Sequence, residues 1–315
     1  VICAAIMGTL PDGLALGGRI VLNGRDLTRL SRREHRSLWA KEIFLLPQEP
    51  WHALAQTRSI RSQVCDMPRL HRADDERNQS LATDMLKSVG LSRDGAKRPS
   101  ELSGGMCQRA AVATALGAPA ALILVDEPTK GLDAAARSQV AKNLHLLLED
   151  GRALLLITHD LRVAGRLGGT MSVMGDKTVI ERGTTYDILS SPRHAMTRAL
   201  IAARPEHWAA RTKTRGATVA ELERVTIRAG RRGPTIVNDF SLRLHAGEVV
   251  GLVGPSGAGK TSVGDAILQL RPTVRGQVRW ASGAERRKFQ KVYQEPLAAF
   301  APWRRIASTI SDALL

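Results

Sequence analysis

The sequence predicts an α/β fold with a parallel sheet at its core, present as two incomplete copies in tandem. Short apolar stretches of strand length alternate with helical segments, which is typical of parallel strands joined by crossover helices. In addition, residues 48–64 align without gaps on residues 294–310, at an offset of 246 residues, and eight of these positions are identical. Because this offset is about the size of one domain, duplication explains the identities better than chance does.

The elements follow one another in a regular order. Strands are expected at 19–24, 43–48, 120–127, 153–160, 170–175 and 248–254, and helices include 72–90, 105–117, 134–149 and 261–270. A polar stretch at 204–221 lacks an apolar period and predicts a linker. The first unit is therefore placed at 1–205, the linker at 206–220 and the second unit at 221–315. Both chain ends have helical patterns without caps, so the first unit is expected to lack its start and the second its end.

Composition excludes several classes of protein. The 315 residues are 43% hydrophobic and 24% charged, as in a globular chain rather than a disordered one. No apolar run is long enough for a membrane-spanning helix. Cys3, Cys65 and Cys107 form no CxxC pair and indicate neither a disulfide framework nor a zinc site. The net charge of +16 leaves nucleic-acid binding open, but the 46 basic residues are spread along the chain, which favours a generally basic surface.

A phosphate-binding loop is predicted in the second unit. The pattern G-x-x-x-x-G-K-[ST] lies between an expected strand and an expected helix. Glycines let backbone N–H groups surround phosphates, while Lys260 neutralises β- and γ-phosphate oxygens and Thr261 can ligate Mg²⁺. The predicted nucleotide-binding residues are Gly254, Pro255, Ser256, Gly257, Ala258, Gly259, Lys260, Thr261 and Ser262.

Two carboxylates and a histidine suggest catalysis in the first unit. Asp126 and Glu127 end one apolar strand, and His159 ends another, 33 residues after Asp126. Asp126 would hold Mg²⁺ through water, and Glu127 would act as a general base on the attacking water. A histidine at a strand end is more often a surface or satisfied core residue. Here, however, it lies where a sensor of the γ-phosphate would be needed.

The segment from Ser103 to Met106 has two interpretations. Ser103, Gly104 and Gly105 precede a helix, and a hydroxyl with free N–H groups at a helix N-terminus attracts anions. Taken alone, the same pattern is an ordinary cap with Ser103 at the N-cap position.

Together these motifs resemble those of the ATP-binding cassette (ABC) ATPases, over essentially the whole chain. The resemblance implies a P-loop NTPase fold with a RecA-like parallel core, a helical subdomain and an antiparallel β subdomain. It also implies that Ser103 and Gly105 face the γ-phosphate bound by Lys260, across a cassette interface. The implied roles are catalysis for Glu127, His159, Gln48 and Gln294; metal binding for Thr261, Gln294, Asp126 and Gln48; and nucleotide contact for Ser103, Gly104, Gly105, Met106 and Asp133.

This sequence departs from the family pattern in two places. Met106 stands where the signature usually has glutamine. No aromatic residue lies near Ala229, where the adenine-stacking side chain is expected, although Arg228 or Arg231 could compensate weakly.

The branch of the family is indicated by residues 190–206 and 103–109, which are similar to those of dipeptide, oligopeptide and nickel importers. No cysteine follows Cys107, so the four-cysteine iron–sulfur element of many such ATPases is absent. The resemblance implies an ATPase subunit of an ABC importer for peptides, nickel or a related small solute, with ATP and Mg²⁺ as cofactors. Its implied partners are permease subunits and, indirectly, a solute-binding protein, at the cytoplasmic face of the cell membrane, with no nucleic acid. The alternatives are a soluble tandem ATPase acting on ribosomes or nucleic acid, and an inactive regulatory module.

The distribution of motifs also predicts an activity for residues 1–315 alone. The phosphate-binding loop lies in the second unit, whereas the carboxylate pair and His159 lie in the first. We therefore expect negligible ATP turnover. An alternative is that residues 220–262 dock on the first unit and complete it, as in a circular permutation.

Overall fold

The computed structural model describes residues 1–315 except 71–73, 131, 133, 150, 205–207, 209–215, 231–232, 255–256, 282–289, 293–299, 302 and 315. It divides into two compact units, Val1–Trp208 and Ala209–Leu315, and the division falls within the predicted linker. Each unit contains a different part of the predicted site. Their identity as incomplete cassettes remains a prediction.

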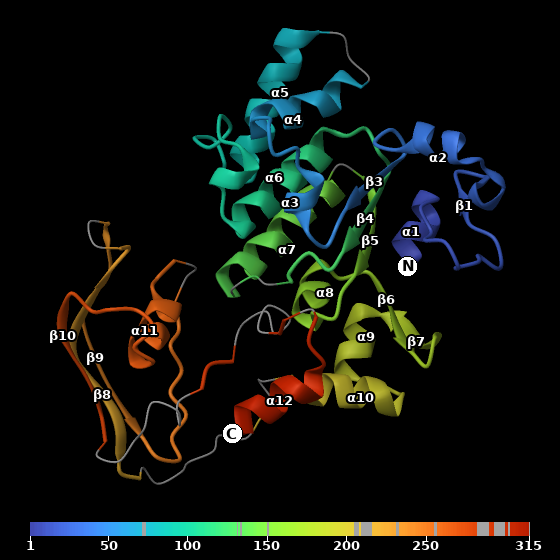
Figure 1. Ribbon diagram of the computed structural model, residues 1–315. Helices are drawn as coiled ribbons and strands as arrows, with labels where there is room; N and C mark the ends of the chain where they lie inside the picture. Colours follow the sequence, from blue (N-terminus) through green and yellow to red (C-terminus); the bar gives the residue numbers. More distant parts are fainter. Residues whose placement is uncertain are drawn as a thin grey trace. The chain divides into compact units, whose positions relative to one another are not determined.

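The first unit combines a parallel sheet with helices and small antiparallel pairs (Figure 1). Its elements are α1 (Ile2–Met7), β1 (Val21–Leu22), β2 (Arg25–Asp26), η1 (Leu27–Arg29), α2 (Arg32–Leu38), β3 (Ile43–Leu46), α3 (Pro50–Ala53), α4 (Ile60–Arg69), α5 (Asp75–Ser88), η2 (Pro99–Glu101), α6 (Gly104–Gly117), β4 (Leu122–Asp126), α7 (Ala134–Glu149), β5 (Ala153–Ile157), α8 (Leu161–Leu167), β6 (Thr170–Gly175), β7 (Thr178–Thr184), α9 (Thr185–Ser190) and α10 (Ala195–Ala202).

The parallel sheet has the order β3–β4–β5, with β4 in the middle. Because side chains alternate along a strand, β4 supplies both faces of the core. Ile123 and Val125 pack with the helical cluster that includes α4, α5, α6 and α7. Leu124 packs on the other face with residues of α1, η1 and α2. Burial on both faces explains why β4 is a nearly continuous apolar run.

Helix α6 is packed closely in the helical part of the unit. Most of its buried side chains are small, and they include Ala110, Ala111, Ala113 and Ala115. At its C-terminal end, a Cβ added to Gly117 would lie 3.0 Å from Met67 Cβ and 3.1 Å from Pro68 Cδ. Small residues therefore let α4 approach the backbone of α6 directly.

The second unit is built on an antiparallel sheet of order β10–β8–β9. Its elements are β8 (Thr218–Arg228), β9 (Thr235–His245), α11 (Lys260–Ile267), β10 (Arg275–Trp280) and α12 (Ile306–Leu314). Val263 and Ala266 of α11 pack on Leu222, Val225 and Ile227 of β8. The sheet thereby supports the helix that follows the predicted phosphate-binding loop.

One predicted strand is wrong in this structure. Residues 248–254 form no strand, and the side chains of Val249 and Val253 are 95% and 98% exposed. The described part of the second unit contains no parallel strand beside them, and an apolar stretch without neighbours cannot be buried on two faces. A smaller difference occurs at 19–24, where only Val21–Leu22 form a strand.

The ends of other elements shift by a few residues. The helix predicted at 261–270 is α11, which begins at Lys260 and ends at Ile267. No helix among the described residues is both long and apolar enough to cross a membrane.

Candidate functional site

The predicted catalytic residues of the first unit lie at the carboxyl ends of β4 and β5. Asp126 ends β4 and is in register with Ile157 of β5. The next residue, Glu127, donates its backbone N–H to the carbonyl oxygen of Ile157 at 2.8 Å. His159 follows two residues after the end of β5. Because the two strands are parallel neighbours, the acidic pair and the histidine meet at one edge of the sheet.

Glu127 and His159 are in direct contact. His159 Nδ1 lies 2.7 Å from Glu127 Oε2, and the His159 backbone N–H donates to Glu127 Oε1 at 3.1 Å. The backbone φ of Glu127 is +46°, a left-handed conformation that non-glycine residues rarely adopt. The Glu127 side chain is 20% exposed, whereas that of His159 is 78% exposed. The carboxylate is thus held in a defined position beside a ring that can take or give a proton.

Gln48 and Asp126, both predicted to bind metal, line one cavity of about 610 Å³. The cavity lies where β3 and β4 end, and its walls are Leu45, Pro47, Gln48, Glu49, Ala53 and Asp126. In the described part of the chain no group of three or more histidine, cysteine or acidic side chains could hold a metal ion. Mg²⁺ characteristically takes one or two carboxylates together with water and phosphate oxygens, so this donor set fits a metal that arrives with a nucleotide.

The cavity also contains a charged residue, Glu49, that was not predicted from the sequence. Glu49 lines the wall, and its Oε1 lies 4.0 Å from Lys130 Nζ. The available signal was the Gln-Glu-Pro triplet, which occurs both at 48–50 and at 294–296. The ion pair connects the segment after β3 to the turn after Glu127.

Ser103 is the N-cap of α6, as one of the two interpretations predicts. Its Oγ accepts a hydrogen bond from the Met106 backbone N–H at 3.3 Å. Ser103 and Gly104 are exposed, and Gly105 is half-buried. Met106 packs against the helical core cluster, so its side chain has a structural role. The Ser103 hydroxyl still has a proton to donate, and capping does not exclude an anion contact.

The described part of the predicted phosphate-binding loop contains two glycines with a left-handed backbone. Gly257 and Gly259 have φ values of +83° and +85°. A Cβ on Gly259 would lie 2.5 Å from Val237 Cγ2 of β9, so only glycine fits there. Lys260 donates from Nζ to the Gly254 carbonyl oxygen at 2.7 Å, which places its ammonium group over the loop. These features fit a nucleotide phosphate chain.

The remaining loop residues lie at the start of α11. Ala258 and Thr261 are exposed, whereas Ser262 is 9% exposed. The predicted site residues Pro255, Ser256, Gln294 and Asp133 lie outside the described residues. The predicted contact between Ser103, Gly105 and a phosphate held by Lys260 involves both units and stays a prediction.

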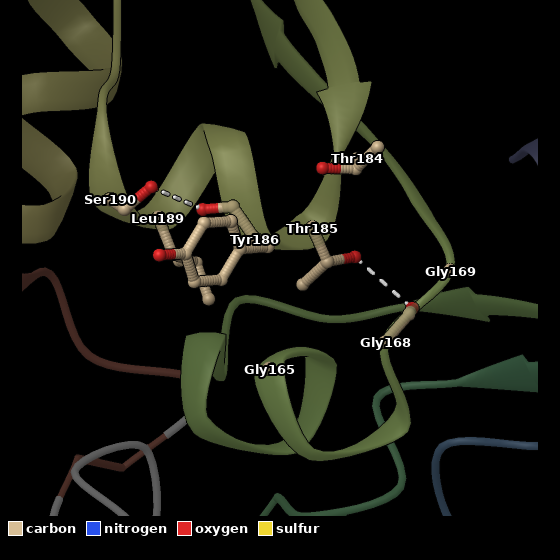
Figure 2. Close-up of a pocket in the computed structure, with 8 residues that line it drawn as sticks. All are labelled: Gly165, Gly168, Gly169, Thr184, Thr185, Tyr186, Leu189 and Ser190. Atoms are coloured by element: carbon tan, nitrogen blue, oxygen red, sulfur yellow. Dashed lines mark hydrogen bonds between the residues drawn. The ribbon is translucent and has the colours of Figure 1, made fainter.

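A second cavity in the first unit lies between α8 and α9 (Figure 2). It has a volume of about 420 Å³ and is lined by Gly165, Gly168, Gly169, Thr184, Thr185, Tyr186, Leu189 and Ser190. Thr185 Oγ1 donates to the Gly168 carbonyl oxygen at 3.1 Å, and Ser190 Oγ donates to the Tyr186 carbonyl oxygen at 2.8 Å. Because the Thr185 and Ser190 hydroxyl groups are used locally and the lining carries no charged side chain, this cavity does not resemble a phosphate site.

The sequence is similar to a known protein family and to several characterised proteins. A family model described as "ABC transporter" matches residues 1–130 and 237–306. A peptidoglycan transport ATP-binding protein of Agrobacterium fabrum is 31% identical over 324 residues, which cover 94% of this chain and 59% of that protein. A dipeptide transport ATP-binding protein of Escherichia coli is 34% identical over 212 residues, or 64% of each protein.

A glutathione import ATP-binding protein of Shigella dysenteriae is 28% identical over 340 residues, which cover 92% of this chain and 55% of that protein. The chain thus spans between 55% and 64% of the length of these three relatives. Among solved structures, a dimeric ATP-binding cassette bound to ADP and phosphate is 25% identical, with a TM-score of 0.49 over 54% of this chain and 74% of that one.

Proposed function

The chain belongs to the ABC transporter family, and we propose that it binds and hydrolyses ATP as the energy-supplying subunit of an importer. The observation that carries the proposal is the contact between Glu127 and His159, 2.7 Å apart at the ends of two parallel strands. A positioned carboxylate beside a histidine and a second carboxylate, Asp126, is suited to activating water for attack on a phosphoryl group.

The phosphate-binding loop supplies the second part of the proposal. Lys260 would neutralise the β- and γ-phosphates of ATP, and the glycine backbone would surround them with N–H groups. Thr261 would ligate Mg²⁺ in the second unit. Asp126 and Gln48 would be the metal-binding residues of the first unit. ATP would supply the phosphoryl group that is transferred to water. Glu127 would accept the proton of that water, and His159 would hold the Glu127 carboxylate in place.

We also propose a substrate class and a location. The names of the three relatives describe transport of peptidoglycan, dipeptide and glutathione, all of which contain peptide or peptide-like bonds. A peptide or a related small solute is therefore the favoured cargo. The partners would be permease subunits, reached from the cytoplasmic face of the membrane, and a solute-binding protein would act indirectly.

Nucleotide binding tests the loop. Lys260→Ala is expected to weaken binding of Mg²⁺–ATP by about 10- to 100-fold, because charge-assisted hydrogen bonds contribute about 1.5–3 kcal/mol each. Equilibrium binding of a fluorescent ATP analogue to the whole chain measures the effect. Arg275→Ala, which removes an exposed charge from β10 of the same unit, is the matched control. Equal binding by wild type and Lys260→Ala would contradict the proposed loop.

Hydrolysis tests the carboxylate. In the importer assembled with its permease, Glu127→Gln should lower ATP turnover by about 10²- to 10⁴-fold, because it removes a general base. ATP binding should persist in this variant. Turnover that does not change in Glu127→Gln would remove the catalytic role and favour a regulatory module instead.

A further inference from the structure

The first unit carries a strongly basic surface that the proposed function does not use. Between residues 19 and 36 the chain has six arginines and only two carboxylates, Asp26 and Glu34. We propose that this surface, the arginine face, binds directly to an anionic phospholipid bilayer. Its members are Arg19, Arg25, Arg29, Arg32, Arg33 and Arg36. The inference goes beyond the proposed function because it requires neither a nucleotide nor a permease.

The fold holds the arginine face on a fixed support. Leu27 of η1 and Leu38 of α2 are 1% and 2% exposed in the cluster beneath the sheet. Helix α2 begins with a capping box formed by Ser31 and Glu34. Arg32 and Arg36 are one helical turn apart and therefore share a face of α2. All six arginines are exposed, so the support is buried while the charges reach the solvent.

The two carboxylates engage only part of this charge. Asp26 lies 3.7 Å from Arg19 and 3.4 Å from Arg29, and Glu34 lies 3.8 Å from Arg25. A hydrogen bond from the Thr28 hydroxyl lowers the pKa of Asp26, and one from the Ser31 backbone N–H lowers the pKa of Glu34. Both carboxylates are therefore ionised at neutral pH. The remaining three arginines, Arg32, Arg33 and Arg36, lie in α2. Within the described part of the chain, no ion pair joins them to a carboxylate.

Neighbouring apolar side chains favour a lipid surface over a nucleic acid. Leu14, Leu16 and Val21 are 51%, 43% and 47% exposed, just before or within the basic stretch. Val21 is in register with Asp26 across the β1–β2 pair, and Asp26 is the carboxylate that pairs with Arg19 and Arg29. Basic residues next to exposed apolar ones are typical of surfaces that lie on anionic membranes. Residues 8–38 contain no Phe, Tyr or Trp, so this region lacks the aromatic platform on which bases stack.

Vesicle co-sedimentation of the whole chain tests the inference without nucleotide. Binding to vesicles of phosphatidylcholine mixed with phosphatidylglycerol should be strong at low salt and should weaken as salt screens the charges. The triple variant Arg32→Gln/Arg33→Gln/Arg36→Gln should lower the partition coefficient by about 100-fold, from the usual contribution of each basic residue near an anionic surface. Pure phosphatidylcholine vesicles should bind both proteins equally weakly.

A charge-matched variant controls for net charge. Arg77→Gln/Arg93→Gln/Arg182→Gln removes three exposed arginines from other parts of the first unit and should change partitioning by less than about threefold. Circular dichroism checks that both triple variants fold.

Equal binding by the α2 triple variant and wild type would overturn the proposal. Binding of wild type to single-stranded RNA in preference to the anionic vesicles, with the same arginine dependence, would overturn it in favour of a nucleic-acid surface. Neither result would affect the importer proposal, which rests on ATP binding and turnover.

Discussion

Two apolar stretches of almost identical character behave differently in this molecule. Residues 122–126 form β4 between β3 and β5, and Ile123, Leu124 and Val125 are completely buried. Residues 248–254 have the same apolar character, yet they form no strand, and Val253 is 98% exposed. The difference shows that an apolar run becomes a core strand only when a neighbouring strand pairs with it.

The two units also differ in how their predicted site residues are held. In the first unit, neighbouring strands carry Glu127 and His159 into contact from positions 32 residues apart. In the second unit, the described loop is organised locally, by left-handed glycines and the start of α11. The first arrangement depends on sheet pairing, whereas the second depends on a few backbone angles.

The largest effect is expected from a charge placed in each stretch. Leu124→Asp should destabilise the first unit by more than about 4 kcal/mol, because it buries an unpaired carboxylate. Val253→Asp should change the stability of the second unit by less than about 0.5 kcal/mol, because the side chain is already in water. Hydrogen–deuterium exchange, read separately for β3–β5 and for α11, measures both. Comparable losses of protection in the two variants would contradict the difference in burial between the two stretches.

A smaller difference is expected between two glycines of the loop. Gly259→Ala places a Cβ 2.5 Å from Val237 Cγ2, whereas a Cβ on Gly257 meets no described atom within 4 Å. Both variants incur the cost of a left-handed residue, about 1–2 kcal/mol, and Gly259→Ala adds overpacking of about 1–3 kcal/mol. Exchange in α11 should therefore increase more for Gly259→Ala. If the two variants were equal, the loop would not depend on its contact with β9.

The smallest effect concerns a surface carboxylate whose neighbours set its pKa. Glu181 of β7 has its pKa lowered, first by the nearby Thr197 side chain and also by hydrogen bonds from the Arg193 and His194 backbone N–H groups. Its stabilisation is therefore present above the unfolded pKa of about 4.3 and is lost as pH falls through the folded value. Glu181→Gln should increase exchange in α10 at neutral pH, and the difference from wild type should shrink near pH 3.

Glu76→Gln, at the exposed first turn of α5, provides the control for that experiment. It should leave exchange in α10 unchanged at both pH values. A Glu181→Gln difference that grows with acidification would contradict the assigned direction.

The elements of the first unit were largely predictable from sequence. The prediction of a helix at 134–149 matches α7 at both ends, and the strands around 43–48, 120–127 and 153–160 are confirmed as β3, β4 and β5. Each of these has a strong apolar pattern bounded by polar or turn residues. The positions of Asp126, Glu127 and His159 at strand ends followed from the same pattern.

The antiparallel strands of the second unit were harder to predict. The predicted linker at 206–220 includes the first residues of β8, which begins at Thr218. The pairing of β8 with β9 shifts register at several positions, and Arg224 and Asp239 have positive φ. Each bulge reverses the alternation of buried and exposed side chains, so the period of two is lost from the sequence. The family resemblance implied an antiparallel part, but the pattern of residues did not locate it.

The details of the site were also beyond the sequence. The Asp-Glu dipeptide does not predict the left-handed φ of Glu127. It also does not predict that the His159 backbone N–H donates to the Glu127 carboxylate. Both follow from the pairing of β4 with β5 and from the turns that leave them. The Lys130–Glu49 pair depends on two segments that only the sheet brings together.

The packing of α6 has a mechanical consequence. With 14 residues the helix is about 20 Å long; Ser103 caps one end, and Gly117 lies against Met67 and Pro68 at the other. Because its buried alanines pack closely against the neighbouring helices, α6 is expected to move as a rigid element. A displacement of α6 at its Ser103 end would therefore be transmitted along the helix to α4, which packs against its Gly117 end.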